Sequence, residues 1–236
     1  GWMLLSYGKK VSVSSSLEGY PAENIVDEDA RTAWVAQSNR DMEWAQVDLQ
    51  RLSSIHAIQV NFDEYGANQK GAVSGVYQSY LIYASVNGED WSLVVDYGTK
   101  KTDTPHDYIE FEEPFKARYI KLQNKEYMVS ENFSVRDLRI FGKGQGSTPR
   151  AVNDFTVERD EADPCKARLC WEAVPDAQGY IVRYGIAGDK LYNNFQVMGE
   201  NTLEIGSLNK GVAYYFTIDA YNENGITRTS RIKVCR

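Results

Sequence analysis

The sequence predicts an all-β chain that forms two consecutive sandwich domains. Short segments in which apolar and polar residues alternate recur along the whole chain, and no segment of useful length has the 3.6-residue periodicity of a helix. The 236 residues exceed what one small sandwich needs. A flexible Gly- and Ser-containing stretch over residues 142–149, closed by a proline, separates the two sets of strands.

The first set of strands precedes this linker. The expected strands are residues 11–16, 44–49, 55–60, 80–85, 108–111, 117–122 and 135–142. Asn87–Gly88 predicts a hairpin turn, because both positions of such a turn favour positive φ. Trp34 and Trp44 lie beside strand patterns, and we expect both in the core because large aromatic residues dominate sandwich cores.

The second set of strands spans about ninety residues, which indicates a smaller sandwich. The expected strands are residues 155–157, 167–171, 179–184, 202–205, 213–220 and 229–234. Trp171 is the expected centre of the core. All three cysteines lie here, and their odd number leaves at least one thiol unpaired. Whether Cys235 pairs with Cys165 or Cys170, or with neither, stays open.

The charge balance excludes some classes of function. The chain has 26 basic and 33 acidic residues, a net charge of -7, so no basic field attracts nucleic acid. Residues 1–146 carry a net charge of -6, whereas residues 147–236 carry -1. No apolar run approaches the length of a membrane span. The opening Gly-Trp-Met-Leu-Leu-Ser lacks a signal-peptide pattern, and we expect a targeting segment and a further domain upstream.

An acidic loop over residues 22–34 is the first candidate site. Asp27, Asp29 and Thr32 bring side-chain oxygens within five residues of one another, and such a loop can wrap a hard cation. Calcium suits it, because calcium accepts six to eight oxygen ligands in a forgiving geometry. The loop lacks the Gly and the closing Glu of an EF-hand. The alternative is an ordinary acidic surface turn.

The order of the acidic loop and the strands around it resembles the discoidin family, or coagulation factor V/VIII C-domain fold, a galactose-binding-like jelly-roll β-sandwich. The resemblance covers about residues 6–144. In that family the loop binds a structural calcium. The resemblance implies these ligands: the carbonyls of Asn24 and Asp29, the carboxylate of Asp27, the carbonyl and hydroxyl of Thr32, and, from the last strand, the carboxylate of Asp137 with a carbonyl beside it at Arg136. Many members carry Glu where this chain has Asp137.

A long polar loop over residues 63–79 is the second candidate site. Its three glycines and few large apolar residues exclude a buried strand, and loops of this length are often functional. It contains Tyr65, Asn68, Gln69, Lys70 and Tyr77. An aromatic face with amide and charged donors suits a sugar, whose ring stacks while its hydroxyls hydrogen-bond. A solvated loop with incidental tyrosines is the alternative.

The discoidin resemblance groups this loop with others at the ligand-binding end of the sandwich. The grouped loops are residues 17–20, 37–42, 63–79 and 125–132. From them we predict Asn39, Arg40, Tyr65 and Tyr127 as ligand contacts. Galactose-binding members often use a histidine, but neither His56 nor His106 lies in these loops, so galactose itself is not the expected sugar.

No set of residues predicts catalysis. An active site needs converging groups such as paired carboxylates, a nucleophile with its base, or an open metal site. His106 beside Asp107 has no nucleophile near it in the sequence, and we interpret it as a turn histidine. The chain is therefore expected to be non-catalytic.

The second domain resembles fibronectin type III. Leu208 precedes Tyr214 by six residues, and Tyr214 would then form the tyrosine corner by hydrogen bonding to the loop after Leu208. The expected organisation is a discoidin-like domain over residues 1–144, a linker over 145–149 and a fibronectin type III domain over 150–236. This role of the second domain is structural.

This pair of domains is similar to the C-terminal region of bacterial family 43 glycoside hydrolases, as are the phrases Thr-Asp-Thr-Pro-His-Asp-Tyr-Ile-Glu and Lys-Ala-Arg-Tyr-Ile-Lys-Leu. The resemblance implies a secreted, periplasmic or cell-surface accessory region that binds a plant-type glycan and follows a catalytic domain. The rival is a structural or adhesive module without a sugar site, in which Tyr65 and Tyr127 would be buried against their own loops. Phospholipid binding is disfavoured, because the loops are polar and the domain is acidic.

Overall fold

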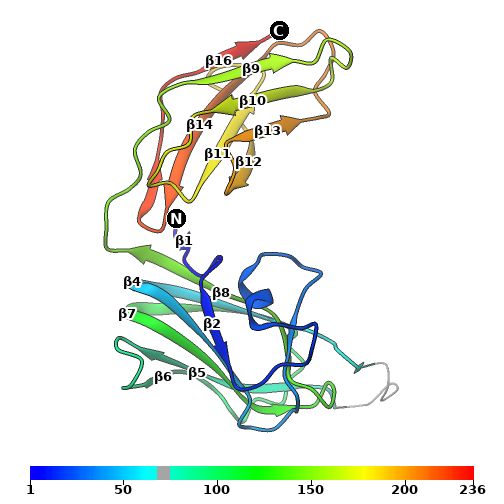
Figure 1. Ribbon diagram of the computed structural model, residues 1–236, viewed down its shortest axis with the longest axis vertical. Helices are drawn as coiled ribbons and strands as arrows, with labels where there is room; N and C mark the ends of the chain where they lie inside the picture. The colour runs from blue at the N-terminus through cyan, green and yellow to red at the C-terminus, as the bar shows by residue number, and fades with distance from the viewer. Residues whose placement is uncertain (68–74) are drawn as a thin grey trace. The chain divides into compact units, whose positions relative to one another are not determined.

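The computed structural model describes residues 1–67 and 75–236. It divides into two compact units, Gly1–Gln145 and Gly146–Arg236, and each is built from β-strands (Figure 1). The all-β sandwich class is therefore confirmed. Within the described residues, no helix has the length and apolar character required to cross a membrane.

The first unit contains eight strands and one short 3-10 helix, η1 (Ala22–Val26). The strands are β1 (Met3–Leu4), β2 (Lys10–Val13), β3 (Trp34–Val35), β4 (Trp44–Phe62), β5 (Gln78–Ser85), β6 (Ser92–Tyr97), β7 (His106–Tyr127) and β8 (Ser134–Gly144). They join in the order β1-β8-β4-β7-β5-β6, with β2 added on β4 and β3 on β8.

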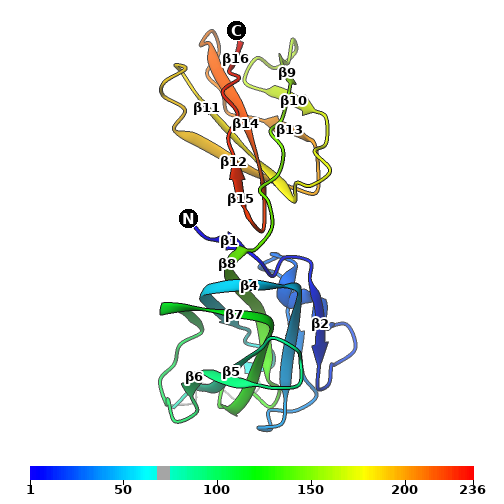
Figure 2. The same cartoon turned by 90° about the vertical axis from the view of Figure 1, so that its left-hand side faces the viewer.

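Two long strands create the two layers of this sandwich. The sequence predicts separate strands at 44–49 and 55–60, but β4 runs through both, with a register break between Asp48 and Ser53. Its first half pairs with β2 and its second half with β8, while β7 pairs along both halves. β7 likewise merges two predicted strands. Because both strands change layers, one continuous sheet closes over its own core (Figures 1 and 2).

The core between the layers follows the alternation along the strands. Ala45 and Val47 of β4 and Ile120 and Leu122 of β7 are all fully buried. Trp34 is also fully buried and packs edge-on against Phe133, as predicted. The aromatic cluster continues through Phe62, Tyr80 and Tyr127.

Trp44 corrects a prediction, because it lies on the outer face of its layer and is only half-buried. Its neighbours Ala45 and Val47 occupy the core positions, so the period-two alternation of β4 turns Trp44 outward together with Gln46. The same alternation is visible in the sequence and outweighs the general preference of tryptophan for cores.

The second unit consists of two sheets. The three-stranded sheet has the order β13-β10-β9, and the five-stranded sheet β12-β11-β14-β15, with β16 on β14. The strands are β9 (Phe155–Arg159), β10 (Ala167–Trp171), β11 (Gly179–Gly185), β12 (Asn193–Met198), β13 (Thr202–Ile205), β14 (Tyr214–Asn222), β15 (Gly225–Thr227) and β16 (Lys233–Cys235). Two of these strands were not predicted from the sequence: β12, whose residues are mostly exposed, and the three-residue β15.

Trp171 is buried in the core of the second unit, as predicted, and packs edge-on against Tyr180. The backbone N–H of Asn209 donates to the hydroxyl of Tyr214 at 3.0 Å, which is the contact expected after Leu208. The fibronectin type III assignment itself stays a prediction. All three thiols are free, with Cys165 exposed and Cys235 buried.

Candidate functional site

The acidic loop after η1 is curled by its own side chains. The Asp27 carboxylate accepts the backbone N–H of Asp29 at 2.9 Å and the Thr32 hydroxyl at 2.6 Å. The Thr32 hydroxyl also lies 3.1 Å from the carbonyl oxygen of Asp29. The Asn24 side chain donates to the carbonyl of Ala33 at 2.8 Å, which ties η1 to the far end of the loop. Oxygens of Asp27, Asp29 and Thr32 therefore lie close together, and Asn24 is tied to the end of the same loop.

The strand β8 packs beside this loop and carries the remaining predicted metal ligands. Asp137 is buried, and its carboxylate accepts one hydrogen bond from Asn61 at 2.9 Å. The pairing of β8 with β4 shifts register between Asp137 and Val135, so Arg136 has no partner residue on β4. Such a bulge re-aims the local backbone. The Arg136 side chain turns away to pair with Asp63 at 2.7 Å.

The electrostatics of Asp137 favour a cation. Burial raises the pKa of the Asp137 carboxyl above its usual range; the hydrogen bond from Asn61 opposes this rise, and the charges of Glu28 and Asp27 add to it. A divalent cation would neutralise this accumulated negative charge. Two carboxylates with several carbonyls and a hydroxyl form an oxygen-only donor set, which fits calcium. No cluster of three or more His, Cys, Asp or Glu side chains occurs in the described part of the chain, and a carbonyl-rich site requires none.

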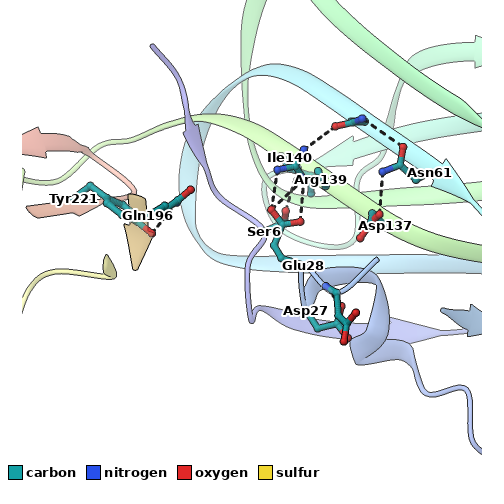
Figure 3. A network of polar contacts seen from close by, with 11 residues as sticks. Ser6, Asp27, Glu28, Asn61, Asp137, Arg139, Ile140, Gln196 and Tyr221 are labelled. Atoms are coloured by element: carbon teal, nitrogen blue, oxygen red, sulfur yellow. Dashed lines mark hydrogen bonds and ion pairs between the residues drawn. The ribbon is translucent and has the colours of Figure 1, made fainter. Parts of the chain in front are cut away.

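Arg139 of β8 brings a positive charge to this loop from outside it, in addition to Arg31, which pairs with Asp29 within the loop. Its guanidinium forms a bidentate contact with Glu28 at 2.8–3.1 Å and donates to Gln59 at 2.9 Å (Figure 3). Glu28 adopts a positive φ of 57°, which turns it toward the strand side of the loop. Neither Glu28 nor Arg139 was predicted from the sequence. The sequence does contain an acidic residue inside the loop and an arginine in the last strand, and these could have suggested an ion pair between the two segments.

Four loops predicted to form the ligand-binding end do come together. The Tyr20 ring lies 5.0 Å from the Tyr65 ring, centroid to centroid. The Tyr127 hydroxyl donates to the carbonyl of Asp63, and the Asn39 amide donates to the carbonyl of Ser130 at 3.0 Å. These contacts join residues 17–20, 37–42, 63–67 and 125–132 at one end of the sandwich.

Tyr127 corrects a prediction, because it is a core residue and has 1% exposure. Its ring packs against Phe62 and Phe133, so no face is left for a ligand to stack on. The residues at 120, 122 and 124 of β7 point inward, and a register shift in the β5–β7 pairing between Ser79 and Tyr80 then changes the phase of the strand. This bulge turns Tyr127 inward where simple alternation would place it outside.

Asn39 and Arg40 are adjacent but differ in what their side chains do. The Asn39 amide nitrogen donates to two backbone carbonyls of the 127–130 segment, so it braces the loop. Arg40 is exposed, and its guanidinium has no ion-pair partner among residues 1–67 and 75–236. Arg40 is therefore the more available of the two for a ligand.

Tyr65 is half-buried and meets Tyr20 edge-on at an interplanar angle of 70°. The two rings form a partly exposed aromatic corner. They are not coplanar, and with Tyr127 buried they do not make the flat exposed pair that would favour sugar stacking most directly. Asn68, Gln69 and Lys70, also named from the sequence, lie outside the described residues. Tyr77 instead donates to Glu126 at 2.5 Å.

His106 lies at the start of β7, and its Nδ1 is 3.1 Å from the side-chain oxygen of Asn61. Asp107 instead accepts from the Tyr80 hydroxyl and from Lys100. The two neighbours point to different partners, so they do not form an acid–base pair.

Comparison with known proteins gives one family and several structural neighbours. The F5/8 type C domain model matches residues 10–137. Lactadherin of Rattus norvegicus is 33% identical over 110 residues, which cover 44% of this chain and 25% of lactadherin. The chain thus spans about a quarter of the length of the curated relatives it matches.

Solved structures share the fold of the first unit. One is a point mutant of chitosan-binding module 1 from a chitosanase/glucanase of Paenibacillus sp. IK-5, with a TM-score of 0.51 and 20% identity over 60% of this chain and all of that one. Another is chitosan-binding module 2 of the same enzyme in complex with chitotriose, with a TM-score of 0.50 and 19% identity over 58% of this chain and 99% of that one. At these identities the likeness concerns the fold.

Proposed function

Because this chain belongs to the F5/8 type C domain family, we propose that its first unit is a non-catalytic glycan-binding module with its ligand site at the loop end. One observation carries the proposal: four loops meet at one end of the sandwich, where Tyr20 and Tyr65 form a partly exposed aromatic corner and the 37–42 loop carries an Arg40 guanidinium that is unpaired among the described residues. Aromatic surface and a planar donor are what a shallow sugar site uses. A module of the same fold has been solved with chitotriose bound, which supports an oligosaccharide as the ligand class.

We also propose a structural calcium in the acidic loop. Asp27 and Asp137 would supply carboxylates, Thr32 its hydroxyl and carbonyl, and Asn24 and Asp29 their carbonyls, together with a carbonyl at Arg136. Burial is the main cause of the raised pKa of Asp137 and disfavours its charged form, and the charges of Glu28 and Asp27 add to this. A bound cation would stabilise the carboxylate, which supports this assignment. The calcium would fix the segment between two of the converging loops.

The wider context follows from the resemblance to family 43 glycoside hydrolases. We propose that the second unit is a fibronectin type III spacer and that the whole chain is an accessory region of a secreted, periplasmic or cell-surface enzyme that acts on plant glycans. The Asn209–Tyr214 hydrogen bond supports the spacer assignment, since a tyrosine corner requires it. A catalytic domain would precede the first unit.

Calorimetric titration of the intact chain against xylan, arabinan and galactan oligosaccharides, with and without calcium, tests the proposal. Saturable binding that is lost in Arg40→Ala and weakened in Tyr65→Ala would support a glycan site at the loop end. Weak binding is expected, because shallow sites gain little beyond stacking and a few hydrogen bonds.

The rival is a structural module that braces a catalytic domain, and the burial of Tyr127 favours it, since one of the two predicted stacking rings is unavailable. No heat with any oligosaccharide, beside a melting temperature that rises with calcium, would replace the glycan-binding proposal with this one.

A further inference from the structure

We propose a second binding surface on the outer face of the layer formed by β2, β4, β7, β5 and β6, and we infer that it takes an extended polysaccharide carrying carboxylate groups. This surface adjoins the loop end at Gln123, which contacts the Asp41 carbonyl, but it lies on the strands, and its ligand class goes beyond the function proposed above. Figure 2 looks onto the strands β4, β7 and β5 of this layer.

Strand register places polar and aromatic side chains side by side on this face. Gln46 of β4 is opposite Lys121 of β7, which is opposite Tyr83 of β5. Trp44 is opposite Gln123, two residues away from the first pair on each of these two strands. All five side chains are half-buried, and since paired residues of neighbouring strands share a face, they present one continuous surface.

Three rings and one ammonium group form a row across this surface. The Lys121 Nζ lies 4.8 Å from the ring centroid of Trp44 and 5.4 Å from that of Trp91. The two indoles are therefore at most about 10 Å apart, a span that two linked pyranose rings can cover. Tyr119 extends the row, with its centroid 6.5 Å from that of Trp91.

The β5–β6 hairpin holds the rings in place. Gly88 occupies the turn with φ +81°, and a Cβ there would come within 3.3 Å of the Tyr119 ring. The Ser85 hydroxyl accepts the backbone N–H of Gly88 at 2.9 Å, which closes the turn. Trp91 follows Gly88 by three residues, at the end of the same turn, and packs edge-on against Tyr119. Because these rings are already held in position, ligand binding would lose little conformational entropy in ordering them.

Charges of both signs lie on this face. Lys10 of β2 is opposite Asp48 of β4, which Arg118 binds at 2.8 and 3.0 Å, and the exposed Asp96 of β6 is opposite Leu81 of β5. Lys121 has no carboxylate within ion-pair distance in the part of the chain that is described. An ammonium group that lies beside two indole rings and has no carboxylate partner among the described residues can pair with an anionic group of a ligand.

The mixture of rings, amides and a cation identifies the chemistry of that ligand. Indole and phenol rings stack on the C–H face of a sugar, and Lys121 can pair with its carboxylate. Gln46 can bond the sugar hydroxyls, and so can the amide oxygen of Gln123, whose amide nitrogen donates to the Asp41 carbonyl. A protein partner would favour an apolar centre, but here amides and charges interleave with the rings. The surface therefore fits an acidic sugar chain better than a protein.

Titration with oligogalacturonate and with glucuronate-substituted xylan oligosaccharides, followed by tryptophan fluorescence, tests this surface. The methyl ester of oligogalacturonate is the matched ligand, because it keeps the rings and loses the charge. All titrations use one fixed calcium concentration. We expect Lys121→Met, which keeps the aliphatic stem, to weaken binding of the acid at least about tenfold and to remove the preference over the ester. Trp91→Ala should weaken both ligands.

Two control variants separate this surface from others. Tyr108→Ala removes an exposed ring from the opposite layer, and Arg40→Ala removes the cation of the loop end. Both should bind the acid with unchanged affinity while Lys121→Met does not. The proposal is overturned if neither acidic ligand binds, if Lys121→Met binds the acid as the unaltered chain does, or if Arg40→Ala loses the binding. The last result would place acidic sugars at the loop end.

Discussion

The loop end and the outer sheet face of the first unit use their polar and aromatic groups in opposite ways. At the loop end, Asn39, Asn124 and Tyr127 direct their side chains to the backbone of neighbouring loops. On the sheet face, Trp44, Trp91 and Lys121 contact one another on a half-open surface. The difference shows that polar residues in a loop can be used to hold the loops together. Side chains in a row on the outer face of a regular sheet can instead remain accessible to a ligand.

Asn124 illustrates the cost of building such a loop end. Its amide nitrogen donates to the carbonyls of Asn39 and Arg40 at 2.8 and 2.9 Å, and its side-chain oxygen is buried without a hydrogen-bond partner among the described residues. An unpaired buried acceptor costs free energy. One buried amide thus fixes the 37–42 loop and leaves Arg40 displayed on a rigid segment.

The largest effect should come from Tyr127, which tests whether the loop end is scaffold. Tyr127→Ala leaves a cavity among aromatic rings and should lower the free energy of unfolding by about 3–5 kcal/mol. Tyr127→Phe keeps the ring and loses the bond to the Asp63 carbonyl, for about 1 kcal/mol. Urea unfolding measures both. If Tyr127→Ala lost ligand affinity but kept its stability, the prediction that Tyr127 contacts the ligand would be restored.

A smaller loss is expected at Asn39. Asn39→Ala leaves the carbonyls of Tyr127 and Ser130 without this hydrogen-bond donor and should lower the free energy of unfolding by about 1–3 kcal/mol. Arg40→Ala is the matched neighbour, and it should change stability by no more than about 0.5 kcal/mol. Equal stability of the two variants would contradict the conclusion that Asn39 holds the loop together while Arg40 does not.

Calcium tests the segment that connects two of the loops. At a hundredfold excess over its dissociation constant, the ion should raise the free energy of unfolding by about 2.7 kcal/mol. Asp27→Asn should abolish this gain. Asp29→Asn should keep it, because Asp29 is expected to offer its carbonyl while its carboxylate pairs with Arg31. Melting temperature with calcium or chelator measures the effect, and equal loss in both variants would contradict the assignment.

The smallest effects are the pH dependences, and those of Asp48 on the sheet face and of Asp137 beside the acidic loop should differ in sign. On the sheet face, Arg118 lowers the pKa of the Asp48 carboxyl, so this pair stabilises the fold above about pH 4 and the benefit is lost as pH falls through the folded-state pKa. An exposed pair of this kind contributes at most about 1 kcal/mol. Asp48→Asn should flatten the acid side of the stability profile.

In metal-free protein, Asp137 behaves in the opposite way, because burial raises its pKa. Its protonated form is the better tolerated one, so stability is highest below about pH 4 and falls as pH rises through the folded-state pKa. Asp137→Asn should remove that fall. Unfolding measured from pH 3 to 7 in chelator checks both variants, and slopes of the same sign would contradict the contrast.

Much of the fold could be predicted from alternation alone. The strands at 167–171 and 202–205 have the predicted bounds, and Trp34 and Trp171 lie in the cores. The continuous strands β4 and β7 could not be predicted, because a polar break in the alternation marks a turn and a bend equally well.

The candidate site was harder to predict, for two physical reasons. A bulge shifts the phase of β7 before Tyr127, and no local sequence feature reports a bulge that depends on the neighbouring strand. For Trp44 the signal was present: Trp44, Gln46 and Asp48 alternate with Ala45, Val47 and Leu49, and this period places the tryptophan outside. Lys121 follows the same rule between Ile120 and Leu122.

The most direct test of glycan binding at the loop end is amide chemical-shift mapping of the intact chain with a neutral xylan oligosaccharide in the presence of calcium. Shifts confined to residues 17–20, 37–42 and 63–67, and absent in Arg40→Ala, are the predicted result. Shifts confined to β4, β7 and the β5–β6 hairpin, or no shifts at saturating oligosaccharide, would contradict a glycan site at the loop end.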